Sequence, residues 1–272
     1  RLEGDELAEV VRFTFERFSD HEIALHLLDE HLDAANPAAA FAVGTPLFAF
    51  VCGKHAYRRA GIIEAIAIQL PERIGIELPD LLPANGGHRV AKQAFEKSLL
   101  WRDQFCFTKR TLELIKELMG VEHVNSALLA VATEPKNRFN ALHLHQCLTA
   151  MQMPERDAHW STFIAEQAVN EDGPVETLIS WAFQQGMDEI EDDRAELAAM
   201  TLTWLGATSA RVIRDPATKA LACLLARRHE LSIQLLAHFR NVDDLYVKER
   251  LLAAIYGGVL QGSGTPGLDK LA

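Results

Sequence analysis

The sequence predicts an all-α fold, built as an α-solenoid of stacked helical hairpins. Apolar side chains recur at the i, i+3, i+4, i+7 spacing of one helical face along most of the chain. Gly and Pro interrupt this pattern about every 15 to 20 residues, as in helix-turn-helix repeats. Only Val10–Phe15 has the β-branched and aromatic composition of a strand. Since solenoids grow by stacking repeats, 272 residues need no division into separate cores.

The first elements of the chain are the strand candidate and two helices. Ser19–Glu22 has the form of a capping box, so we expect a helix to begin there. Its apolar face includes Leu28. The segment 60–70 is apolar nearly all round, which predicts a helix buried between neighbours. Pro71 is expected to end this helix because proline cannot donate the next backbone hydrogen bond.

The middle of the chain continues the helical pattern through residues 144–151 and, after a break at Pro154, through residues 160–164. Pro174 then begins a helix that Gly186 is expected to end. A second helix follows and ends at Gly206. These two helices predict a helical hairpin.

An internal repeat is visible near the C-terminus. Asp215–Lys219 and Asp244–Lys248 both read D-x-x-[TV]-K. Asp215 and Asp244 are each expected to cap a helix as structural repeat caps, and the inward faces of the two helices are expected to stack as successive layers. Those faces consist of Thr218, Ala222 and Leu225 in one helix and Val247, Leu251 and Ala254 in the other. This is the form of a HEAT-type unit, with a chance match as the alternative.

Composition narrows the function classes. The chain is 49% hydrophobic and 24% charged, which is typical of a folded protein and not of a disordered one. Its net charge is −11 and no basic run offsets it, so nucleic-acid binding is not expected. No apolar stretch reaches the roughly 18 residues of a membrane span, and the first residues lack the layout of a signal peptide. Four scattered cysteines suit reduced thiols, so a cytoplasmic location is expected.

Four places in the sequence come close to a catalytic or metal-binding motif. Gly53–Lys54 lacks the upstream glycine that a P-loop needs to wrap phosphates. His21–His26 places its second histidine one position too far along for a zincin helix. His143 and His145 point to opposite sides of a helix, which predicts two solvent-facing histidines. Cys52 with His55 offers only two of the four ligands of a closed metal site. No catalytic residue and no metal site are therefore predicted, and the chain is not expected to be an enzyme.

Two further groups of side chains have structural explanations. The acidic run 188–193 is expected to form a solvated helix start that the helix dipole favours, with a partner-binding patch as the alternative. The four tryptophans are expected to fill the core rather than to bind a ligand. They are Trp101, Trp160, Trp181 and Trp204.

Several segments resemble parts of NACHT-type STAND ATPases. Val11–Phe18, followed by Ser19–His21 and a helix, resembles the closing part of their winged-helix domain. The long helical region of large bacterial proteins of this class, several of them linked to antiphage defence, is similar to Ala60–Pro71, Met153–Trp160 and Arg214–Gly257.

The resemblance implies a division of the chain. Residues 1–35 would be the end of a winged-helix domain, residues 36–206 a helical region, residues 207–262 HEAT-like repeats and residues 263–272 a flexible tail. The chain has no initiator Met and ends in a segment rich in Gly and Pro, so we expect it to be part of a longer protein.

The resemblance also implies a function. The chain would be a non-catalytic sensor or regulatory arm of a STAND-type signalling ATPase in antiphage defence. ATP or ADP would bind an upstream ATPase module, and the chain itself would hold no cofactor. Its partner would be another protein or that module. The family's phosphate- and magnesium-binding motifs are absent here, so its ATPase activity is not assigned to this chain. A free-standing HEAT-like scaffold is the alternative.

Arg12 occupies the position that the resemblance connects with nucleotide sensing. In the family a histidine shortly before the conserved aromatic faces the phosphates of bound ADP. When Phe15 is matched to that aromatic, the histidine position falls on Arg12, which is a departure from the pattern. A guanidinium can also grip phosphate oxygens. The alternative is an arginine at a strand edge, paired with a carboxylate such as Glu16.

Overall fold

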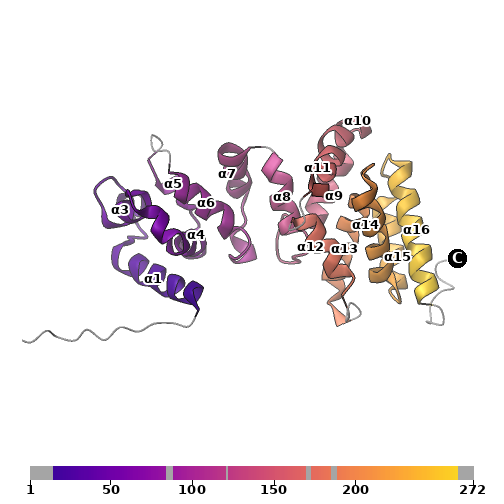
Figure 1. The fold of residues 1–272 in the computed structure, drawn as a ribbon, viewed down its shortest axis with the longest axis horizontal. Coiled ribbons are helices and arrows are strands. Elements are labelled where there is room, and N and C mark those ends of the chain that lie inside the picture. The colour runs from indigo at the N-terminus through magenta and orange to yellow at the C-terminus, as the bar shows by residue number, and fades with distance from the viewer. Residues whose placement is uncertain (1–14, 84–87, 121, 170–172, 185–188, 263–272) are drawn as a thin grey trace, which may run out of the picture. The chain divides into compact units, whose positions relative to one another are not determined.

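Every regular element that the structure describes is a helix (Figure 1). The computed structural model describes residues 15–83, 88–120, 122–169, 173–184 and 189–262. The predicted all-α fold is therefore confirmed for these ranges. Contacts within the chain divide it into two compact units, Arg1–Cys106 and Phe107–Ala272. This division falls inside the region 36–206, and the predicted domain boundaries stay predictions.

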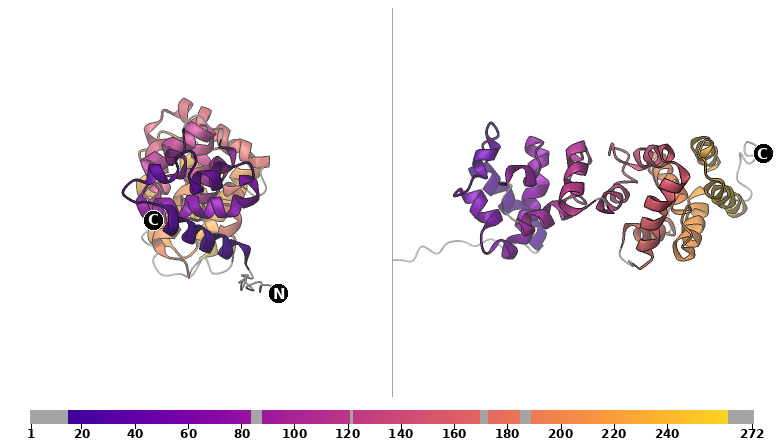
Figure 2. Two further views of the ribbon diagram at one scale, coloured as in Figure 1. Left: turned by 90° about the vertical axis from the view of Figure 1, so that its left-hand side faces the viewer. Right: turned by 90° about the horizontal axis from the view of Figure 1, so that it is seen from above.

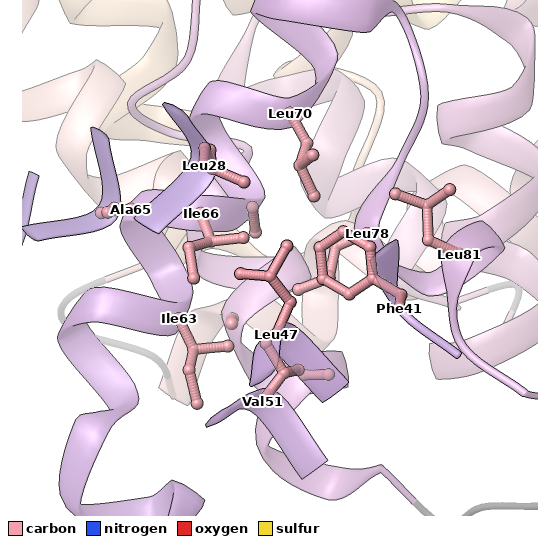
Figure 3. Close-up of a cluster of buried hydrophobic side chains, with 14 of the residues drawn as sticks. Leu28, Phe41, Leu47, Val51, Ile63, Ala65, Ile66, Leu70, Leu78 and Leu81 are labelled. Carbon is pink, nitrogen blue, oxygen red and sulfur yellow. The ribbon is translucent and has the colours of Figure 1, made fainter. Parts of the chain in front are cut away.

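The described residues of unit 1 form six α-helices and two short 3-10 turns. The elements are α1 (Glu16–His31), α2 (Pro37–Ala40), α3 (Pro46–Cys52), η1 (Ala56–Arg59), α4 (Ala60–Ile74), α5 (Leu78–Leu81), α6 (Arg89–Ser98) and η2 (Gln104–Cys106). Helix α4 is the central element because α1 and α6 both pack against it. Figure 3 shows its buried residues Ile63, Ile66 and Leu70 among side chains of the neighbouring helices.

The prediction that Pro71 ends this central helix is wrong. Helix α4 continues through Pro71 to Ile74 and ends at Gly75, whose φ of 70° is the left-handed conformation that glycine adopts without strain. Pro71 removes one backbone donor, but the turn that contains it is buried. Packing of this turn in the core therefore outweighs the lost hydrogen bond.

The capping box predicted at Ser19–Glu22 is also wrong. Helix α1 begins at Glu16, and the N–H of Ser19 donates to the carbonyl of Phe15. Asp20 instead lies against Gly61 of α4, where any larger side chain would collide with its carboxylate. Of the predicted strand, residues 10–14 lie outside the described residues, and Phe15 is extended as the residue before α1.

Unit 2 contains the remaining helices. They are α7 (Lys109–Met119), α8 (Glu122–Ala130), α9 (Ala141–Ala150), α10 (Met153–Arg156), the π-helical turn η3 (Asp157–Ser161), α11 (Thr162–Glu166), η4 (Gln167–Val169), α12 (Pro174–Ala182), α13 (Asp192–Leu205), α14 (Arg211–Leu225), α15 (His229–Phe239) and α16 (Leu245–Gln261). Within this unit α14 packs on both α13 and α16, and these three helices follow one another in Figures 1 and 2.

Close approach of α14 and α16 depends on two glycines. A side chain on Gly257 would come 3.1 Å from Cβ of Ala222, and one on Gly258 would come 3.1 Å from the carbonyl oxygen of Ala222. The lack of side chains at these positions lets the backbones pack tightly. Of the predicted inward faces, Leu225 of α14 and Leu251 of α16 are each 1% exposed, and Ala222, Val247 and Ala254 are buried as well. Thr218 is only half-buried, so the prediction is confirmed for the other residues of the two faces.

Several predicted helix ends are confirmed. Pro174 lies in the first turn of α12, and Gly206 directly follows the last residue of α13. Gly186 lies outside the described residues. Asp192 and Asp193 occupy the first turn of α13, and the side chain of Asp192 is 98% exposed, as expected for a solvated helix start.

Candidate functional site

The predicted site residues have three different outcomes. Arg12 lies outside the described residues, so its assignment stays a prediction. Asp244 is the N-cap of α16, where its carboxylate accepts hydrogen bonds from the backbone N–H groups of Tyr246 and Val247. The third prediction is that the chain has no metal site, and it can be compared only with the described residues. Among the described residues no group of three or more His, Cys, Asp or Glu side chains is arranged to hold a metal ion.

The prediction that Asp215 caps a helix is wrong. Helix α14 begins four residues earlier, at Arg211, and Pro216 lies inside it. The carboxylate of Asp215 pairs with Arg214 at 2.8 Å. The matching Asp of the two repeat copies therefore occupies a helix interior in one copy and a helix N-cap in the other. The two segments are not structurally equivalent at the 29-residue offset.

The histidine prediction for α9 is wrong for His145, which is 8% exposed. Its Nδ1 accepts a hydrogen bond from the indole N–H of Trp204 at 3.1 Å. Its ring also packs against Phe239, with the ring centroids 4.8 Å apart. Partners on α13 and α15 decide this burial, and the spacing of two histidines in the sequence gives no sign of them.

A buried polar cluster surrounds Trp204. The indole N–H of Trp160 donates to the carbonyl of Trp204 at 2.9 Å, and both tryptophans are fully buried, as predicted. Arg156 is also fully buried, with its guanidinium 5.4 Å from the centre of the Trp204 ring. Its N–H groups donate to the carbonyls of Leu148 and Met151 and to the carboxylate of Asp243. The cluster thereby joins α10 to the residues that precede α16.

Electrostatics in this cluster favour neutral histidine and ionised aspartate. Burial, and then the nearby His238, lower the pKa of His145 to about 4, although a hydrogen bond with the His238 backbone acts in the opposite direction. The Arg156 hydrogen bond lowers the pKa of Asp243. His238 in turn lies 2.9 Å from Glu196. The cluster lies inside the helix packing, so we assign it to holding the helices together.

The chain contains two cysteine–histidine pairs, Cys52 with His55 in the sequence and Cys147 with His143 in the structure. Burial raises the pKa of the Cys52 thiol to about 11. Sγ of Cys147 lies 3.6 Å from Nε2 of His143, and burial raises the pKa of this thiol as well. A nucleophilic cysteine needs a lowered thiol pKa, so neither pair has the electrostatics of a catalytic thiol.

An exposed aromatic surface lies in unit 1, where α6 ends and η2 begins. We call it the Trp101 surface, and it comprises Leu100, Trp101 and Phe105. Trp101 is 60% exposed, Phe105 72% and Leu100 62%. Such exposure is notable because large apolar side chains that cluster at a surface commonly mark an interaction site. The prediction that all four tryptophans fill the core is therefore wrong for Trp101, and Trp181 is only half-buried.

Arg17 joins α1 to this surface. Its guanidinium lies 3.9 Å from the centre of the Trp101 ring and also pairs with Glu64 of α4. Two residues after Trp101, the backbone N–H of Asp103 donates a hydrogen bond to Glu72 of α4 at 3.0 Å. The Trp101 ring is thus held by the Arg17 guanidinium, and the segment that follows it is tied to α4 through Glu72. In the sequence, this site could have been recognised from Leu100 and Trp101, two large apolar residues that directly precede the charged residues Arg102 and Asp103 after the end of α6.

No family model, curated protein or solved structure matches the chain. The helices that the structure describes include none with the length and apolar character needed to cross a membrane. The assignment of function therefore depends on the chain's own residues.

Proposed function

We propose that the chain is a non-catalytic helical arm that binds a protein partner through the Trp101 surface. The observation that carries this proposal is the exposure of Trp101 and Phe105 in one short segment of unit 1, whereas Trp160 and Trp204 of unit 2 are fully buried. Tryptophan and phenylalanine are enriched at protein interfaces, and tryptophan is prominent among residues that dominate binding energy. No catalytic step is assigned to the chain.

The partner proposed first is the ATPase module of a STAND-type signalling protein of the NACHT class, in antiphage defence, with this chain as its sensor or regulatory arm. The helical composition of the described residues and the sequence resemblance of Val11–Phe18 support this proposal. In it, the N-terminal residues close a winged-helix domain and the helices continue as an α-solenoid with HEAT-like repeats at residues 207–262. ATP or ADP binds the module and not this chain.

A free-standing helical scaffold is the second candidate, favoured by the same exposed surface. The reading frame upstream of the Arg1 codon separates the two. A phosphate-binding motif in that frame supports the regulatory arm, and the Trp101→Ala variant of the longer protein is then expected to change basal ATP hydrolysis. A frame without such a motif, or an unchanged hydrolysis rate in the variant, supports the scaffold.

Arg12 is part of the first proposal as a nucleotide-sensing residue. Arg12→Ala in the longer protein is expected to weaken ADP retention and to raise basal activity, because the variant loses a fixed cationic contact to phosphate. The helical arm is expected to keep its circular dichroism spectrum. Unchanged ADP affinity together with unchanged basal activity would assign Arg12 a structural role.

A further inference from the structure

We infer that the Trp101 surface binds a basic, apolar peptide segment of its protein partner. This inference rests on the proposed function and names the chemistry of the partner at the same site. The occupant is a segment in which Arg or Lys alternates with aliphatic side chains, so that cations meet carboxylates while apolar groups cover the exposed rings.

The charge around the surface selects a basic occupant. Three carboxylates are connected to the segment that carries Trp101: Glu64 pairs with the Arg17 that stacks on the ring, Asp103 follows Trp101 by two residues, and Glu72 accepts from the Asp103 backbone. Glu16 and Asp20 add negative charge at the start of α1, where burial and then Glu16 raise the pKa of Asp20. The cations on the same segments are Arg17, Lys97, which is exposed one turn before Leu100, and the buried Arg102, whose charge is paired with that of Glu77. Carboxylates therefore outnumber cations around the exposed rings, which favours a cationic partner.

The chain itself contains the contact that we propose for the partner. Arg17 stacks on the Trp101 ring while its guanidinium pairs with Glu64. Cation–π stacking together with a carboxylate bond holds a guanidinium in a defined orientation. Glu72 and Asp103 are exposed, and each uses one carboxylate oxygen for a backbone hydrogen bond, so the other oxygen can accept from a second cation. A partner arginine can bind there in the same way.

Leu100 and Phe105 supply the apolar part of the site. They lie on either side of Trp101 in the sequence, and both are more than half exposed. Burial of these side chains against aliphatic groups of the peptide removes apolar surface from water, which stabilises the complex independently of charge. The combination predicts that neither a purely basic nor a purely apolar peptide binds as well as one with both properties.

The test is fluorescence anisotropy of dye-labelled synthetic 12-residue peptides with the full chain. The first peptide repeats the unit Arg-Arg-Leu-Leu. The second peptide has Glu in place of each Arg, and the third has Ser in place of each Leu. The Arg/Leu peptide is expected to bind saturably and at least about ten-fold more tightly than the other two. Equal binding of the Arg/Leu and Glu/Leu peptides would overturn the inference.

Two variants separate this site from general attraction of a basic peptide to a chain of net charge −11. Trp101→Ala keeps the charge, and it is expected to weaken binding by roughly ten-fold or more, as loss of an interface hot spot does. Tyr256→Ala in α16 is its control, because Tyr256 is an aromatic residue with a similar exposure of 67%. It is expected to leave binding unchanged. Equal affinities of the two variants would overturn the inference.

The charge contribution has its own matched pair. Glu72→Gln with Asp103→Asn is expected to weaken binding more than Glu176→Gln with Asp192→Asn, which removes the same charge in unit 2. If the two double variants lose the same amount of peptide affinity, the binding depends on net charge alone and the inference is overturned. Hydrogen exchange of the free variants confirms that unit 1 remains folded.

A second copy of the chain is the competing occupant. Analytical ultracentrifugation of the chain and of Trp101→Ala decides this point, because a dimer that dissociates in the variant would overturn the peptide assignment. Failure of every peptide overturns only the partner chemistry. The proposed function fails separately, when Trp101→Ala leaves the activity of the longer protein and the binding of every partner unchanged.

Discussion

Each unit buries an arginine completely, but the two arginines have different carboxylate partners. In unit 1, Arg102 pairs at 2.6 Å with Glu77, whose side chain is only 4% exposed. In unit 2, Arg156 pairs at 2.7 Å with Asp243, whose side chain is 50% exposed. Asp244, which also lies near Arg156, keeps two backbone hydrogen bonds as a helix cap. If the arginine is lost, the carboxylate in unit 1 stays buried without its cation, whereas the carboxylates in unit 2 keep water or N–H donors.

The largest expected effect follows from this comparison. Arg102→Met is expected to lower the free energy of unfolding by about 3–5 kcal/mol, because it leaves the Glu77 charge buried without this cation. Arg156→Met is expected to cost less. Urea unfolding combined with segment-resolved hydrogen exchange measures both, since the two units need not unfold together.

A double variant is the control for that experiment. Arg102→Met with Glu77→Leu removes both charges, and it is expected to recover most of the stability that Arg102→Met loses. If Arg156→Met costs as much as Arg102→Met, exposure of the partner carboxylate does not determine the penalty, and the comparison between the units fails.

The next effect tests the packing of α16 in unit 2. Leu251→Ala is expected to cost about 2–5 kcal/mol, because Leu251 is 1% exposed and its removal leaves a cavity against α14. Leu252→Ala is the matched control, since its side chain is 54% exposed, and it is expected to change stability little. A loss below about 1 kcal/mol for Leu251→Ala, measured by urea unfolding, would contradict the observed register of this helix.

A pH effect is expected in unit 2 because of His145. In the unfolded chain this histidine binds a proton near its ordinary pKa of 6.5, whereas in the folded chain it does so only near pH 4. The unfolded state therefore binds more protons between these values, and stability falls as the pH falls. The difference corresponds to about 3 kcal/mol between pH 7 and pH 4.

Urea unfolding at pH 7 and at pH 4.5 measures this effect. His145→Gln keeps an acceptor for the indole N–H of Trp204 but cannot take up the proton, so its stability is expected to depend less on pH than that of the wild type. An equal pH dependence in both proteins would show that His145 does not cause the acid destabilisation.

The smallest of these effects distinguishes the two copies of the D-x-x-[TV]-K motif. Asp244→Ala is expected to cost about 0.5–2 kcal/mol because it removes the N-cap of α16. Asp215→Ala is expected to cost less, since Asp215 lies inside α14 and pairs only with its neighbour Arg214 among the described contacts. Thermal unfolding of the two variants side by side checks this order, and equal losses would return Asp215 to a capping role.

The sequence by itself determined the fold class and those helix ends that depend on local chemistry. Pro174 begins a helix because its missing N–H costs nothing in the first turn, and Gly206 and Asp244 mark a helix end and a helix start. The buried faces of α14 and α16 follow from apolar periodicity. Each of these signals acts within a few residues, so the sequence displays it completely.

Only the tertiary structure decided the features whose partners lie far away in the chain. Helix α4 continues through Pro71 because that turn is buried, and His145 is buried because Trp204 and Phe239 reach it from other helices. Trp101 stays exposed, although its size predicted a core position, because it follows the end of α6 and stacks on Arg17. Burial and long-range contacts outweigh local propensity at these positions, because their free energies depend on side chains that no local pattern specifies.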